Sequence, residues 1–335
     1  MVRCWFLCIT IESRPVLDTS HLEARASIIP GMTSHVYVGT REGLWVLEKD
    51  QVFPAEALTG KSLTALAPDG ARVWALVDGR TLWEGVDSTW TERATIDEQD
   101  ATCLASTPSG LLIGTEEAHV LRLDGHRLTR VESFDAMDGR DAWYTPWGDP
   151  ADVRSICAAR DGALHVNVHV GGVARSRDGG RTWTPTVDIE VDVHQILAHP
   201  THPGVVLVAA ADGFGVSRDG GDSWRFITAG MHAHYLRAVA VSGDSVLVSA
   251  SSGPGGRRAA IYRARLEGGD PVFERCQAGL PSWFGDNVDT GCLAAAGAFV
   301  VCGTEDGRVF RSLDGGAHWD IAAKGLPPVT CVSLS

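Results

Sequence analysis

One eight-residue pattern, Ser-x-Asp-x-Gly-x-x-Trp, occurs three times in this chain, over residues 176–183, 217–224 and 312–319. The first two copies start 41 residues apart (176 to 217), and the third starts 95 residues later (217 to 312). Periods of about 40–50 residues, each holding several short strands, are typical of the blades of a β-propeller. The spacing therefore predicts repeated four-stranded units, with one unmarked unit between the second and third copies.

The residue types in this pattern suit a tight turn between two strands. An Asp carboxylate can accept backbone N–H groups across a turn, and glycines allow a positive φ. A Trp covers the hairpin with a large apolar face. We therefore expect the three copies to stabilise turns, without contacting a ligand.

The pattern resembles the Asp-box, or BNR, repeat of sialidase-type β-propellers. Similar repeats occur in sortilin-like receptors, in photosystem II assembly factors and in xyloglucan-active glycosidases. The resemblance implies an all-β propeller fold. It implies no particular activity, because the repeat is shared by enzymes, receptors and assembly factors.

Seven short segments rich in small residues are predicted to be the innermost strands of blades: residues 63–67, 101–105, 153–157, 193–197, 236–240, 289–293 and 329–333. Second strands are predicted at residues 36–40, 73–77, 111–115, 164–168, 206–210, 246–251 and 299–304.

The C-terminal segment lacks following strands and the first N-terminal strand lacks an innermost partner, so the two should complete one blade and leave no exposed edges. The prediction is a single seven-bladed propeller over residues 34–335. A six-bladed count would require merging blades across residues 135–152 or 277–289. A mixed α/β fold is disfavoured, because no segment shows sustained helical periodicity.

Composition limits the possible partners and compartment. The net charge of −13 argues against a nucleic-acid partner and an anionic membrane. The eight Cys show no CxxC spacing, and four of them fall within predicted innermost strands, which suggests buried free thiols, a reducing compartment and a cytoplasmic protein. These four are Cys103, Cys157, Cys292 and Cys331.

The first 33 residues are predicted to be a disordered or loosely attached extension. Their apolar run, residues 4–10, is too short to span a bilayer and is a poor signal peptide. Met32, just before the first clear strand, could be the natural start.

Three loops that lead into predicted innermost strands are long or rich in functional groups. They cover residues 135–152, 230–235 and 279–289, and they contain Trp, Tyr, His, Asp and Asn side chains. In a propeller these loops share one end of the central channel with the loops that follow the second strands. The sequence therefore predicts a ligand site at this channel mouth, at the opposite end from the three repeated turns.

The second residue of each predicted innermost strand gives a more specific prediction. Around the ring these residues are Thr64, Thr102, Arg154, His194, Arg237, Thr290 and Thr330, so two Arg and one His gather on one side. Arg binds carboxylate, phosphate or sulfate groups in a bidentate manner. The alternative is that Arg154 and Arg237 pair with Asp152 and Asp289 and only order the mouth.

The ligand-binding candidates at the mouth are Arg154, Arg237, His169, Tyr235, Trp147, Trp283 and Asn287. The catalytic candidates, chosen as groups that transfer protons near neutral pH or as carboxylates that could form a pair, are His194, His232, His234, Asp152 and Asp289. Five His residues (165, 169, 194, 232 and 234) could also hold a metal, but no compact ligand motif is present, so we expect no metal and no cofactor.

The resemblance to sialidases is incomplete at the residues of their active site. Sialidases use three Arg, a Tyr–Glu pair and an Asp, and they have six blades. Arg154 and Arg237 could match two of the Arg, and Tyr235 or Tyr144 the Tyr, but the Arg-Ile-Pro signature is absent and the three loops contain no Glu. The prediction is a site for an anionic or sugar-like molecule, hydrolytic if the protein is an enzyme. The alternative is a non-catalytic scaffold for a protein partner.

Overall fold

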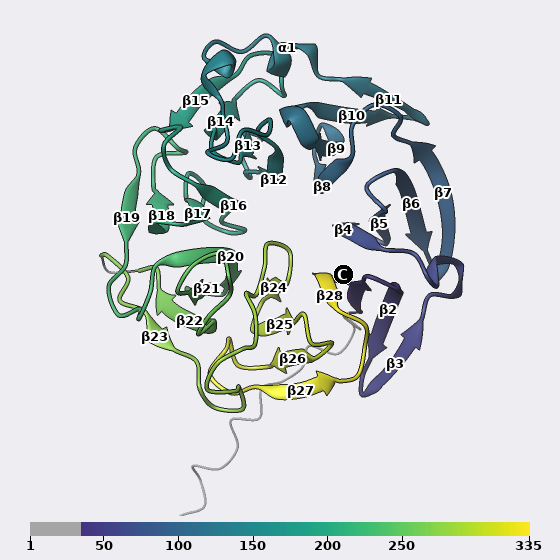
Figure 1. Ribbon diagram of the computed structural model, residues 1–335, viewed down its shortest axis with the longest axis vertical. Coiled ribbons are helices and arrows are strands. Elements are labelled where there is room, and N and C mark those ends of the chain that lie inside the picture. Colours follow the sequence, from purple (N-terminus) through teal and green to yellow (C-terminus); the bar gives the residue numbers. More distant parts are fainter. Residues whose placement is uncertain (1–34, 268) are drawn as a thin grey trace, which may run out of the picture. The chain divides into compact units, whose positions relative to one another are not determined.

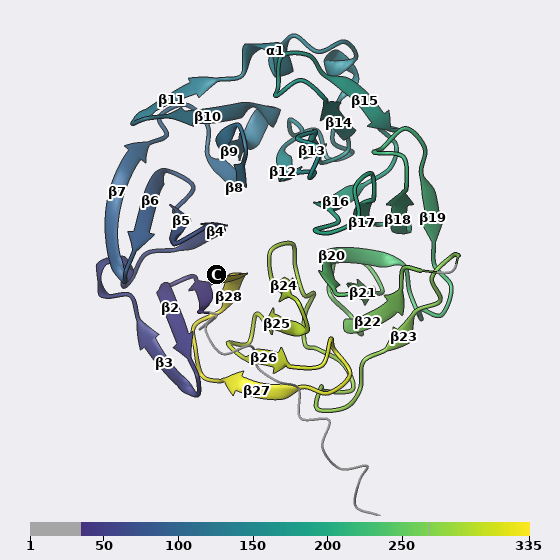
Figure 2. The ribbon, with the colours of Figure 1, turned by 180° about the vertical axis from the view of Figure 1, so that it is seen from behind.

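The computed structural model describes residues 35–267 and 269–335, and the predicted extension over residues 1–33 lies outside them. The described chain forms seven four-stranded antiparallel sheets. They stand around a common centre as the blades of a propeller (Figures 1 and 2). The prediction of seven blades is confirmed, and the six-bladed alternative is wrong.

Blades 1 to 4 are given from the innermost strand outward. Blade 1 contains β28 (Val329–Leu334), β1 (Val36–Thr40), β2 (Gly43–Glu48) and β3 (Gln51–Pro54). Blade 2 contains β4 (Leu63–Asp69), β5 (Arg72–Val77), β6 (Thr81–Val86) and β7 (Thr89–Thr95). Blade 3 contains β8 (Ala101–Thr107), β9 (Gly110–Thr115), β10 (Val120–Asp124) and β11 (Arg127–Arg130). Blade 4 contains β12 (Val153–Ala158), β13 (Leu164–Val168), β14 (Gly172–Ser176) and β15 (Thr184–Val187).

Blades 5 to 7 follow the same order. Blade 5 contains β16 (Val193–Ala198), β17 (Val206–Ala210), β18 (Gly213–Ser217) and β19 (Arg225–Ile227). Blade 6 contains β20 (Tyr235–Ser242), β21 (Ser245–Ser251), β22 (Ala260–Arg265) and β23 (Glu274–Arg275). Blade 7 contains β24 (Leu293–Ala296), β25 (Phe299–Gly303), β26 (Val309–Ser312) and β27 (Asp320–Ala323). Short helical turns lie in connections: η1 (Glu56–Leu58), η2 (Glu116–Ala118), α1 (Glu132–Asp135) and η3 (Arg140–Ala142).

The two ends of the described chain complete blade 1. Strand β28 pairs antiparallel with β1, with Val36 opposite Leu334 and Val38 opposite Val332. The pairing confirms the predicted closure of the ring and leaves neither strand as an open edge at this position.

Six of the seven predicted innermost strands are present at the expected positions, and the segment over residues 289–293 is the exception. Strand β24 begins only at Leu293. The amide of Cys292 donates to the carbonyl of Asp289 at 2.9 Å, so the preceding residues form a turn instead of a strand.

The apolar core lies between successive blades. Clusters of buried Val, Leu, Ala and aromatic side chains join neighbouring sheets, as Leu207 and Phe214 of blade 5 do with Leu236 and Val248 of blade 6. The Cys residues of the described chain are free thiols and buried, as predicted for four of them: Cys103, Cys157, Cys276, Cys292, Cys302 and Cys331. None of the helices in the described ranges is long and apolar enough to cross a membrane.

The three repeated turns connect the third and fourth strands of blades 4, 5 and 7. In the first, Asp178 Oδ1 accepts the amides of Arg181 and Thr182, each at 2.9 Å, and Ser176 Oγ accepts the amide of Gly180 at 2.8 Å. Gly316, the matching glycine of the third turn, has a φ of +87°, and an added Cβ would lie 2.6 Å from Leu247 Cδ2. The pattern therefore encodes a turn that requires its Asp, Ser and Gly.

Candidate functional site

A β-bulge near the start of the innermost strands turns one side chain out of the regular alternation. In blade 4, Val153 pairs with Val168 and Ser155 with Asn167, which leaves Arg154 as the extra residue. Register shifts at the matching place involve Thr64, Thr102, His194, Arg237 and Thr330. Bulges re-aim side chains, which explains why the second strand residue differs in chemistry from its neighbours.

Several bulge residues bind the next blade. Thr330 Oγ1 donates to the carbonyl of Leu63 at 2.6 Å, and Thr102 Oγ1 donates to the carbonyl of Val153. His194 Nδ1 lies 2.5 Å from the carbonyl oxygen of Leu236 and takes the place of a threonine hydroxyl. No such bond is made by the guanidinium of Arg154 or Arg237 within the described ranges. Arg237 instead forms the ion pair with Asp289 that the alternative prediction named, so only Arg154 is left without a carboxylate partner among the described residues.

A second regularity places polar residues beside these bulges. In each of these blades, one backbone hydrogen bond joins the end of the second strand to the start of the innermost strand. The donor is the amide of the residue just after the second strand, and the acceptor is the carbonyl of the residue two positions before the bulge residue. Asp78 donates to Ser62, Glu116 to Asp100, and His169 to Asp152, each at 2.8 Å. Each pair therefore presents two neighbouring side chains at the same end of the ring.

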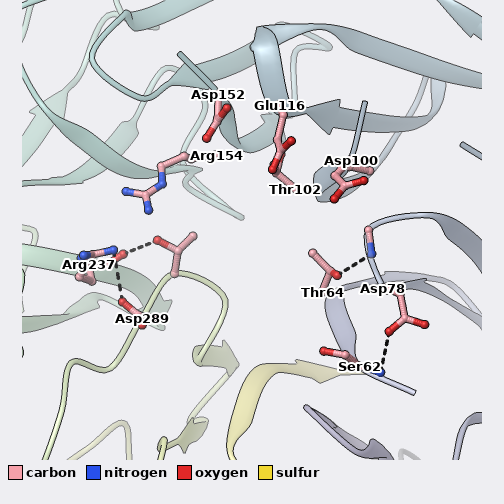
Figure 3. Close-up of a pocket in the computed structure, with 13 residues that line it drawn as sticks. Ser62, Thr64, Asp78, Asp100, Thr102, Glu116, Asp152, Arg154, Arg237 and Asp289 are labelled. Carbon is pink, nitrogen blue, oxygen red and sulfur yellow. Dashed lines mark hydrogen bonds and ion pairs between the residues drawn. The ribbon is translucent and has the colours of Figure 1, made fainter. Parts of the chain in front are cut away.

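All of these paired residues except His169 line a cavity of about 660 Å³ at that end of the ring, which we call the mouth cavity. Its charged side chains are Asp78, Asp100, Glu116, Asp152, Asp289, Arg154 and Arg237, and its hydroxyl groups come from Ser62, Thr64, Thr102 and Thr290. Figure 3 shows Arg154 and Arg237 on one side, with Asp78 and Asp100 on the other. The cavity is thus strongly polar, and both cations lie on one side of it, together with Asp152 and Asp289.

Arg154 is the cationic group of the cavity most available to a ligand. None of the described carboxylates lies within ion-pair distance of its guanidinium, so the alternative pairing with Asp152 is not formed. Burial lowers the pKa of Arg154, and the neighbouring positive charge of Arg237 lowers it further. Arg237 Nη1 lies 3.5 Å from Asp289 Oδ1, which is an ion pair but not a short hydrogen bond. An incoming anion would stabilise both cations.

Two carboxyl groups of the cavity have raised pKa values. Burial raises the pKa of Asp152, although His169, Arg154 and a backbone amide oppose the shift. Burial also raises the pKa of Glu116, and the negative charges of Asp100 and Asp152 raise it further. Carboxyl groups with raised pKa values in a polar cavity are candidates for proton transfer.

Beside the cavity, three side chains of blades 4 and 5 form a group that we call the His–Asp–His cluster: His169, Asp192 and His194. Asp192 lies between the two imidazoles, with Oδ1 3.0 Å from His169 Nε2 and Oδ2 3.2 Å from His194 Nε2. Trp147 packs on His169 and Tyr235 on His194, with ring centroids 5.2 and 4.8 Å apart.

The remaining predicted site residues lie elsewhere. His232 Nδ1 is 2.7 Å from the Tyr262 hydroxyl, and its ring packs on Trp283. The guanidinium carbon of Arg275 also lies 3.7 Å from the centroid of the Trp283 ring. Asn287 is buried and donates to the carbonyl of Pro254 at 3.1 Å. His234 is exposed. Neither these four residues nor Asp286 line the mouth cavity.

The site predicted from the sequence lacks three acidic residues that line the cavity: Asp78, Asp100 and Glu116. Glu116 immediately follows a short second strand and lies outside the three long loops. The signal was present in the sequence, because Asp stands two residues before the bulge in Asp100-Ala-Thr102, Asp152-Val-Arg154 and Asp192-Val-His194.

The sequence matches no protein-family model and no curated protein. An ancestral GH74 enzyme is similar in structure, with a TM-score of 0.57 and 13% identity over 90% of this chain and 40% of that chain. The GH74 xyloglucanase from Xanthomonas campestris gives 0.56 and 16%, over 86% and 46%. The computationally designed Ika8 protein gives 0.54 and 14%, over 81% and 80%. This chain spans less than half of both GH74 enzymes, and the likeness shows the propeller fold alone.

Proposed function

We propose that the mouth cavity binds a small sugar-like molecule that carries an anionic group. Support comes above all from Arg154, whose guanidinium faces the cavity with none of the described carboxylates within ion-pair distance. Arg237, held by one long contact to Asp289, would supply the second cation. Two guanidinium groups can bind a carboxylate, sulfate or phosphate in a bidentate manner.

The opposite side of the cavity suits hydroxyl groups of the same ligand. Asp78, Asp100 and the hydroxyls of Thr64 and Thr102 line it. Carboxylates accept hydrogen bonds from sugar hydroxyls, and threonine hydroxyls both donate and accept. A ligand with a negative charge at one end and hydroxyls at the other would match this division.

If the site is catalytic, Glu116 and Asp152 are the proposed proton-transfer pair. Both line the cavity and both have raised pKa values. Glycoside hydrolysis uses two carboxyl groups on either side of the scissile bond. We therefore propose hydrolysis of a glycosidic bond next to an acidic sugar as the reaction class.

The test is binding of glucuronic acid, a simple acidic sugar, and of a glucuronide with a chromogenic leaving group. Thermal stabilisation and calorimetry should show binding to the wild type and its loss in the R154A/R237A double variant. Arg160→Ala is the matched control, because Arg160 is exposed at the other end of blade 4. Equal stabilisation of wild type and double variant would disprove the role of the two Arg.

The alternative is a protein-binding scaffold that uses the loop before blade 4. Tyr144 and Trp147 on this loop are large side chains with 45% and 58% of their surface exposed. This reading would be favoured if the cavity bound no acidic sugar and a Y144A/W147A variant lost a defined stoichiometric partner.

A further inference from the structure

The His–Asp–His cluster joins ligand-type atoms from two neighbouring blades. His169 follows the second strand of blade 4, while Asp192 and His194 lie at the start of blade 5. One nitrogen of each imidazole and a carboxylate oxygen all lie within 4.8 Å of one another. The side chains are 11%, 29% and 0% exposed, in chain order.

The tautomer of His194 is fixed by its surroundings. A carbonyl oxygen can only accept, so the Nδ1 atom facing Leu236 must carry the hydrogen. With its hydrogen on Nδ1, the ring of His194 presents the lone pair of Nε2 toward Asp192.

The lone pair of His194 Nε2 faces the negatively charged carboxylate of Asp192, which is unfavourable. His194 Nε2 and Asp192 Oδ1 are both buried without a well-aligned hydrogen bond, although His169 Nε2 lies 3.0 Å from Asp192 Oδ1. His194 Nε2 lies 3.2 Å from the other carboxylate oxygen, which is also an acceptor. Buried polar atoms without partners are rare and costly. A positive charge between these atoms would satisfy both.

We propose that His169, Asp192 and His194 bind a divalent transition-metal ion of the Zn²⁺ class. Two imidazole nitrogens and one carboxylate oxygen favour zinc over magnesium or calcium, which prefer oxygen ligands. A tetrahedral zinc ion with bonds of about 2.0–2.1 Å places its ligand atoms roughly 3.3–3.4 Å apart. The separations of 3.0 and 3.2 Å involve the two different oxygens of Asp192, and one ligand atom from each of the three residues lies within 4.8 Å of the other two, so an ion would draw the imidazoles closer together.

Two further features support this site. The bond from His194 Nδ1 to the Leu236 carbonyl is the outer contact that commonly orients a metal-binding imidazole. The Asp192 side chain keeps 29% of its surface exposed, so an ion can reach it without opening the ring. Three protein ligands would leave one position for water or a substrate atom.

The experiment measures metal uptake by the full chain and does not depend on the proposed sugar ligand. Protein stripped with a chelator would be dialysed against Zn²⁺, and its metal content measured. Co²⁺ would be used as a spectroscopic probe of tetrahedral geometry. The expected result is one equivalent of metal in the wild type and loss of this equivalent in H169A, D192A and H194T, with unchanged circular dichroism.

Two controls separate this site from surface His residues. The competing pair is His199 and His202, whose Nδ1 atoms lie 3.1 Å apart, and H202A should retain the metal. H234A, which alters an exposed His outside the cluster, should also retain it. Absence of uptake by folded wild type, or uptake lost in H202A but kept in H169A, would overturn the proposal. If the folded wild type takes up no metal, a proton shared between His194 Nε2 and Asp192 would take the place of the ion.

Discussion

His194 Nδ1 donates to the carbonyl oxygen of Leu236 at 2.5 Å and joins blade 5 to blade 6. Thr102 and Thr330 make the matching contact between other neighbouring blades with a hydroxyl group. A histidine thus performs the structural task of a threonine, and its second nitrogen is left for the His–Asp–His cluster. The structural and functional roles of this side chain can therefore be separated by substitution.

Replacement of His194 by Thr should retain the bond between the blades, whereas replacement by Val should remove it. Thr and Val are nearly equal in size, so their difference isolates the hydrogen bond. H194V should be less stable than H194T by about 1–2 kcal/mol, because the Leu236 carbonyl loses its buried donor. Chemical unfolding measures the difference, and equal stabilities would show that the bond contributes nothing.

The buried serine of the second repeated turn should contribute more to stability than the exposed hydroxyl of the same turn. Ser217 is 1% exposed, and its Oγ accepts the amide of Gly221 at 2.7 Å. S217A should cost about 1–3 kcal/mol, because that buried amide loses its acceptor. Ser223→Ala in the same turn is the control, since water replaces its exposed hydroxyl. A larger loss in S223A than in S217A would contradict this account.

Asp314 of the third turn should contribute stability that is lost in acid. Burial raises the pKa of Asp314, but hydrogen bonds from His318 and Ser312 outweigh this effect and lower the pKa to about 2. A carboxyl whose pKa falls on folding stabilises the protein above its unfolded pKa, and this contribution disappears as pH falls through the folded pKa. The stability difference between wild type and D314N should therefore shrink as pH falls from about 5 through the folded pKa of about 2. Parallel unfolding curves against pH would exclude this role.

The fold could be predicted from the sequence because its signals are local and repeated. The Ser, Asp, Gly and Trp of each turn act within eight residues, and the short apolar strands recur at blade spacing. Ring closure followed from unpaired strands at residues 36–40 and 329–333. The start of β24 was misjudged because Asp289 and Cys292 form a turn whose residues resemble those of a strand.

The candidate site was only partly predictable, because it depends on contacts between blades. The two Arg and His194 were found from their place in the strands. The sequence could not show that His194 bonds to Leu236, or that Asp192 lies between two imidazoles, because these contacts join different blades. Proximity across a propeller mouth depends on the rotation between blades, which local sequence does not report.

Glu116 and Asp152 should make the protein less stable as pH rises above about 4, the pKa range of unfolded carboxyl groups. Burial raises the pKa of each carboxyl, so the folded protein holds protons that the unfolded chain has already released. Stability then falls with rising pH between the unfolded and folded pKa values. Relative to wild type, E116Q and D152N should gain stability on going from about pH 4 to 7, as measured by urea unfolding. Asp212→Asn, at an exposed position, is the control. If the difference in the free energy of unfolding between variant and wild type stays constant with pH, the cavity does not shift the pKa values of these two carboxyl groups. Their proposed role in proton transfer would then lose its basis.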